Sequence, residues 1–120
     1  MKLNWVLLVV SFSCFATTFE NEHFKIEIDT DSCSDTDLVC TSIPYHSVNK
    51  RDGSSLVIDN GRTYNVGPYR NFRGYTFTHG HYTYLLRMDL DSTEADAWRL
   101  NVFKGNSLLI LDEPITINDD

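Results

Sequence analysis

The sequence is poor in cysteine and in basic side chains, and beyond its N-terminus it has no long apolar run. Only two of its three cysteines, Cys33 and Cys40, lie beyond residue 16, which excludes a scaffold built from several disulfides. Ten lysines and arginines face 17 aspartates and glutamates, for a net charge of −7. Nucleic acids and anionic lipids are held largely through cationic side chains, so we expect neither as a partner.

Sequence motifs of catalysis are also absent. There is no Gly-x-Ser-x-Gly, no His-Glu-x-x-His and no phosphate-binding loop. Small β domains rarely provide the deep cleft that catalysis by paired carboxylates prefers. We therefore expect no catalytic residues and no cofactor. A small hydrolase acting on wall or glycan material stays an alternative, because catalytic residues need not be close in sequence.

The first 16 residues have the layout of a secretory signal peptide. A basic start at Lys2 precedes an apolar run from Trp5, which ends at Cys14-Phe15-Ala16. Small residues at 14 and 16 fit cleavage before Thr17. Removing Lys2 with this segment leaves 9 basic and 17 acidic residues, a net charge of −8 for residues 17–120. We expect a periplasmic or secreted protein with one mature domain, 17–120.

The N-terminus has two other interpretations, a membrane anchor and a lipidation site. A membrane anchor needs about 20 apolar residues, whereas Ser11, Ser13 and Thr17 interrupt this run. Lipidation of Cys14 needs a small residue where Phe12 stands. We therefore expect no membrane span, with lipidation kept as an alternative.

Cys33 and Cys40 form an even pair in a chain expected to be exported, which favours a disulfide. The closed loop has eight residues, and chain entropy gives such a bond about 2.5 kcal/mol of stabilisation. Two thiols alone do not complete a zinc shell.

Alternation with a period of two recurs along the chain, whereas helical periodicity is almost absent. Phe24, Ile26 and Ile28 alternate with polar residues, as in a half-buried strand. Asn60-Gly61 is a turn dipeptide, and a single helical turn fits only at 89–97. The pattern predicts an all-β fold, a small antiparallel sandwich or barrel. Its expected strands are 24–28, 39–45, 56–58, 63–66, a hairpin at 74–88, 98–102, 108–111 and a short edge strand at 115–117.

The hairpin at 74–88 allows a register to be predicted. A two-residue turn at His79-Gly80 pairs Phe77 with Tyr82 and Tyr75 with Tyr84. These four aromatic side chains then share one face, which we expect to be the core.

The stretch 39–84 resembles small exported bacterial single-disulfide β-domain proteins without assigned activity. The residues that carry the resemblance are Val39-Cys40, Tyr45, 49–53, Gly61, 72–77, Gly80 and 82–84. The resemblance implies a bacterial periplasmic setting and a β fold, and it transfers no catalytic residue. The chain is also similar to bacterial lysozyme inhibitors and periplasmic immunity proteins in having a signal peptide, one disulfide and a β-rich pattern. This similarity is an analogy of fold class.

Metal binding has two sets of candidate ligands. His79 and His81 flank a glycine, but His23 and His46 lie in other predicted elements, so we expect no histidine site. The acidic clusters at 29–37 and 89–96 lack the glycine and glutamate of an EF-hand loop. We expect no metal, with calcium in these clusters as a minority alternative.

The predicted loop 67–73 is the main candidate for binding. It combines Tyr69, Arg70, Phe72 and Arg73, and tyrosine and arginine are enriched among interface hot spots. Alternatively, both aromatic rings pack on the sheet and the arginines pair with carboxylates. We expect a non-enzymatic binding domain, inhibitor- or immunity-like, for a cationic protein; a structural envelope-associated domain is the second hypothesis.

Overall fold

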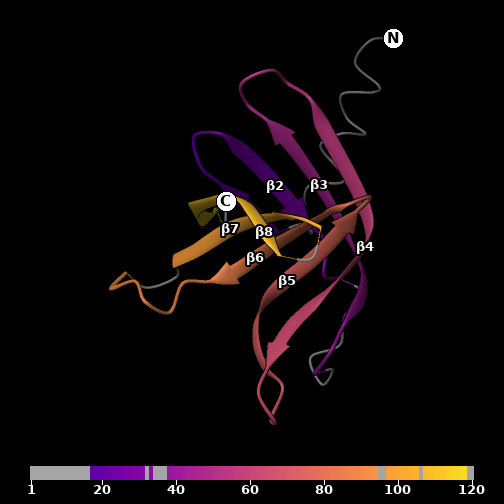
Figure 1. Cartoon of the computed structure of the whole chain (residues 1–120), viewed down its shortest axis with the longest axis vertical. Coiled ribbons are helices and arrows are strands. Elements are labelled where there is room, and N and C mark those ends of the chain that lie inside the picture. The colour runs from indigo at the N-terminus through magenta and orange to yellow at the C-terminus, as the bar shows by residue number, and fades with distance from the viewer. Residues whose placement is uncertain (1–16, 32, 34–37, 95–96, 106, 119–120) are drawn as a thin grey trace.

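Eight antiparallel strands follow one another around a closed sheet, in which β1 pairs with β8 (Figure 1). The computed structural model describes residues 17–31, 33, 38–94, 97–105 and 107–118. The predicted signal peptide, 1–16, lies outside the described residues. Of the two predicted architectures, sandwich and barrel, the barrel is confirmed. The strands are β1 (Thr17–Glu20), β2 (Phe24–Ile28), β3 (Thr41–Asn49), β4 (Ser55–Val66), β5 (Asn71–His79), β6 (Tyr82–Met88), β7 (Ala97–Lys104) and β8 (Leu108–Asn118).

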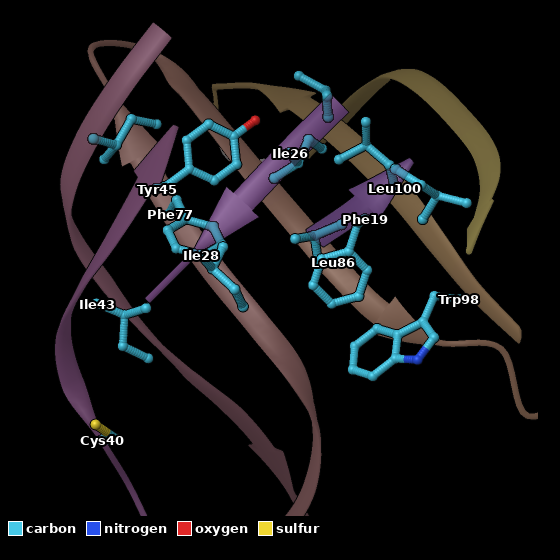
Figure 2. Close-up of a cluster of buried hydrophobic side chains, with 13 residues drawn as sticks. Phe19, Ile26, Ile28, Cys40, Ile43, Tyr45, Phe77, Leu86, Trp98 and Leu100 are labelled. Atoms are coloured by element: carbon cyan, nitrogen blue, oxygen red, sulfur yellow. The ribbon is translucent and has the colours of Figure 1, made fainter. Parts of the chain in front are cut away.

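The interior of the barrel is filled with side chains. Inward-facing side chains alternate with outward-facing ones in β2, where Ile26 and Ile28 are buried and Lys25 is exposed. An eight-stranded barrel is just wide enough for such side chains to fill it. Figure 2 shows the rings of Tyr45 and Phe77 close together, with centroids 4.7 Å apart. The fully buried side chains are Phe19, Ile26, Ile28, Ile43, Phe77, Leu86, Leu100 and Ile115.

The C-terminal strand closes the barrel, which corrects a prediction. We expected a strand at 108–111 and a separate edge strand at 115–117. Instead β8 is one strand of 11 residues, paired with β7 on one side and with β1 on the other. Ile115 therefore lies in the core rather than at an edge.

The predicted turn at Asn60-Gly61 is also wrong, because both residues lie inside β4. The register with β3 shifts between Ile43 and Tyr45, so this part of β4 is a bulge. The Asn60 amide joins this bulge to β5 instead. Its Nδ2 donates to the Thr78 carbonyl oxygen at 2.9 Å, and its Oδ1 accepts from the Thr78 N–H at 3.2 Å. A turn dipeptide is thus absorbed into a continuous strand.

The β5–β6 hairpin has a different register from the predicted one. Gly80-His81 forms the turn, and Phe77 pairs with Tyr84 rather than with Tyr82. The partner is displaced by two residues, which keeps every side chain on its face because the side-chain period of a strand is two. The prediction that Phe77 lies in the core is therefore confirmed, at 1 % exposure.

Cys33 and Cys40 form the predicted disulfide, which joins the β2–β3 connection to the start of β3. Backbone bonds link this region to β4: Thr63 N–H donates to the Cys40 carbonyl oxygen at 2.9 Å. In the 89–97 connection the described residues form turns and no helical turn.

Tyr45 makes the stability of the barrel sensitive to alkaline pH. Its phenol is buried, and this desolvation, helped by the nearby Tyr84, raises its pKa from 10.0 to about 12. Above pH 10 the unfolded chain loses this proton while the folded protein keeps it, so stability falls as pH rises. We expect the free energy of unfolding to drop by about 2–3 kcal/mol between pH 10 and 12.

Urea unfolding at several pH values measures this loss, and Tyr45→Phe is the control. Burial also raises the pKa of Tyr75 and Tyr84, so the variant should keep a shallower slope. An unchanged slope in Tyr45→Phe would show that the Tyr45 phenol is not responsible.

Candidate functional site

The four predicted binding residues lie in or directly after the β4–β5 turn, which projects from the barrel at the bottom of Figure 1. Only residues 67–70 form the turn, closed by a bond from Arg70 N–H to the Gly67 carbonyl oxygen at 3.1 Å. Phe72 and Arg73 belong to β5, so the predicted loop 67–73 was too long. A register shift between Tyr64 and Asn65 lets β5 continue pairing as far as Asn71.

The two aromatic residues of this region behave differently. Phe72 is 38 % exposed, and its ring packs edge-on against Tyr75 with centroids 5.2 Å apart. Tyr75 in turn stacks on Trp98 at 6.2 Å, so Phe72 belongs to an aromatic column at this end of the core. Tyr69 is 81 % exposed. The alternative that both aromatic rings pack on the sheet is therefore correct for Phe72 and wrong for Tyr69.

The arginines of the turn do not pair with carboxylates among the described residues. Arg73 donates to the Phe72 carbonyl oxygen at 3.1 Å, and Arg70 is exposed with a φ of 53°. Such a φ is strained for a residue other than glycine. Arg99 gives the contrast: its Nε lies 2.6 Å from Asp112 Oδ1, and this hydrogen bond lowers the pKa of the Asp112 carboxyl.

Leu38 extends the exposed surface, although no sequence signal pointed to it. Its side chain is 63 % exposed. Asn65 Nδ2 donates to the carbonyl oxygens of both Leu38 and Arg70, each at 2.9 Å. The β2–β3 connection is thereby tied to the β4–β5 turn, and Leu38 joins Tyr69 and Arg70 at one end of the molecule.

An open cleft of about 390 Å³ lies beside this turn and is lined by Val39, Arg62, Thr63, Asn65 and Arg70. Sequence reasoning placed only Arg70 at a candidate site. The sequence feature that could have indicated Arg62 is the local excess of positive charge. Strands β4–β6, residues 55–88, carry four arginines and one carboxylate, Asp59, in a chain that is otherwise strongly acidic.

The histidines do not converge. His23 Nδ1 lies 3.1 Å from Glu113 Oε1, whereas His79 and His81 are exposed at the β5–β6 turn. Within the described ranges no three His, Cys, Asp or Glu side chains gather as metal ligands. For the calcium alternative, residues 35, 37 and 96 of the acidic clusters lie outside the described residues.

Fold and site together define an eight-stranded antiparallel barrel with an aromatic–arginine turn and a basic cleft beside it. No protein-family model, no curated protein and no solved structure matches the chain. In the part of the chain that the structure describes, no helix is long and apolar enough to cross a bilayer.

Proposed function

We propose that the protein is an exported, non-enzymatic binding domain whose ligand is another protein. Within that class an inhibitor- or immunity-like role, such as blocking a cationic wall hydrolase, is the specific form of the proposal. Tyr69 and Arg70 are the anchors, and Phe72 and Arg73 support the turn that carries them. The Cys33–Cys40 disulfide is compatible with export to the periplasm or the cell exterior.

The observation that carries the proposal is the exposure of Tyr69 next to Arg70, which has a positive φ and forms no ion pair with a described carboxylate. A tyrosine that is 81 % exposed at a projecting turn contributes little to folding. Tyrosine and arginine dominate interface hot spots because they combine a large contact area with hydrogen bonding. The turn sits on a closed barrel and is tied to the β2–β3 connection, so little conformational entropy is lost on binding.

The net charge of −8 for residues 17–120 supports a cationic partner. Carboxylates spread over the surface attract such a protein during diffusional encounter, and salt screens this attraction. We therefore expect the association rate to fall as the salt concentration rises, while the dissociation rate changes little.

We expect Tyr69→Ala and Arg70→Ala each to weaken binding by about 2 kcal/mol, or roughly 30-fold in dissociation rate. The partner is first captured on immobilised protein from envelope extract or from a panel of cationic lysozymes. Its association and dissociation rates are then measured by surface plasmon resonance.

Val57→Ala is the matched control, because Val57 is also a largely exposed apolar residue, at 67 %, and lies towards the opposite end of β4. It should bind like wild type. If Tyr69→Ala and Arg70→Ala also bind like wild type with the fold intact, this turn is not the binding site. If no protein is retained at low salt, the structural envelope role is favoured instead.

A further inference from the structure

We propose that the cleft between Arg62 and Arg70 is a binding site for a carboxylate group. This proposal goes beyond the proposed function, because Arg62 and Thr63 lie outside the β4–β5 turn. An acidic domain is also expected to repel anions elsewhere on its surface. The cleft is lined by both arginines, Thr63, Asn65 and Val39.

Two arginines, Arg62 and Arg70, line this cleft, and neither pairs with a carboxylate of the described residues. Six described carboxylates form ion pairs: Glu20, Glu22, Glu27, Asp89, Asp112 and Glu113. Neither Arg62 nor Arg70 is among their basic partners. Guanidinium forks match the planar geometry of a carboxylate and bind it through two parallel hydrogen bonds. Two arginines in one cleft that no described carboxylate neutralises favour an external anion.

Thr63 adds a third donor. Its Oγ1 accepts a hydrogen bond from Cys40 N–H at 3.1 Å, which uses one lone pair and leaves the hydroxyl hydrogen. Among the described residues that hydrogen has no acceptor. The charged and hydroxyl groups of the cleft are thus donors, which is the arrangement that an anion requires.

The walls of the cleft are held in place before any ligand arrives. Asn65, which lines the cleft, donates from Nδ2 to the carbonyl oxygens of Leu38 and Arg70, and its Oδ1 is buried without a partner among the described atoms. A buried unpaired acceptor is unfavourable, as is the positive φ of Arg70. Two locally unfavourable features that hold one cleft in shape indicate that its geometry serves binding.

A carboxylate fits this cleft better than a phosphate does. Each added negative charge on the ligand is repelled by the net −8 of residues 17–120, so a singly charged anion is favoured over a doubly charged one. The carboxylate comes from a free small acid or from an acidic side chain of the protein partner.

NMR titration of the mature protein with sodium acetate, at constant ionic strength in chloride, tests the site. We expect the Nε–Hε signals of Arg62 and Arg70 to shift along a saturable curve, while that of Arg51, exposed at the β3–β4 turn, stays in place. Arg62→Gln and Arg70→Gln should each weaken acetate at least fivefold. Arg51→Gln, which removes the same charge outside the cleft, should bind acetate like wild type.

Arg70→Gly separates binding from folding. It removes the guanidinium and also relieves the strained φ, so the thermal midpoint should be no lower than that of wild type while acetate binding is lost. Non-saturating shifts, wild-type acetate affinity in both Arg62→Gln and Arg70→Gln, or tighter binding of phosphate than of acetate would each overturn the proposal. If a protein partner is captured and acetate displaces it, the carboxylate belongs to that partner. The proposed function is tested separately, because it fails if Tyr69→Ala captures the partner like wild type.

Discussion

Phe77→Ala is expected to lower the free energy of unfolding by about 3–5 kcal/mol. The Phe77 ring is 1 % exposed, lies 4.7 Å from the Tyr45 ring and covers Gly61. Because neighbours relax only partly, removing the ring loses its packing and leaves a cavity. For a domain of about 100 residues this is a large share of a total stability of about 5–15 kcal/mol.

Urea unfolding followed by circular dichroism measures this loss. Thr76→Ala, one position earlier on the outer face of β5, should cost well under 1.5 kcal/mol, because it removes one methyl and a hydroxyl from the surface. A loss below about 1 kcal/mol for Phe77→Ala would mean that the ring does not fill the core.

Gly74→Ala is expected to destabilise the protein by about 3 kcal/mol or more, enough to reduce the yield of folded barrel. Gly74 is buried in β5 with a φ of 152°, which side chains of L-residues rarely adopt. An added Cβ would collide with the Leu86 carbonyl oxygen and lie 2.8 Å from Arg87 Cα. Both are backbone atoms of β6, so relief requires β5 and β6 to separate.

Gly53→Ala is the control for the effect of φ alone. Gly53 has a φ of 76° and nothing within 4 Å of an added Cβ, so it should cost only about 1–2 kcal/mol. Thermal and urea unfolding of the two variants then isolate the collision at Gly74. Equal losses for both would show that backbone strain, and not contact with β6, sets the cost.

Local alternation was enough to find most of the strands, and local turn signals were less reliable. The 24–28 strand and the core position of Phe77 followed from the period of two alone, which survives a two-residue slip in register. The turn predicted at Asn60-Gly61 was wrong because the same dipeptide can form either a turn or a bulge. Only the Thr78 backbone of a neighbouring strand decides between them.

The candidate site was predictable in part. Tyr69 and Arg70 stood out by residue type, and the acidic background made the arginines conspicuous. Arg62 and Thr63 were missed because they are 8 and 7 positions from Arg70 in the sequence. The cleft exists because β4 turns back into β5 and the Cys40 region packs beside it.

The sequence by itself determined the all-β class, the pairing of Cys33 with Cys40 and the inward face of the strands, because alternation and cysteine count are properties of the local chain. Only the tertiary structure decided that the sheet closes. Closure depends on β1 and β8 pairing across almost the whole chain, Phe19 with Ile117, and no local pattern encodes a contact over that separation. The same holds for which arginines remain without carboxylate partners, because ion pairing depends on which loops the closed barrel brings together.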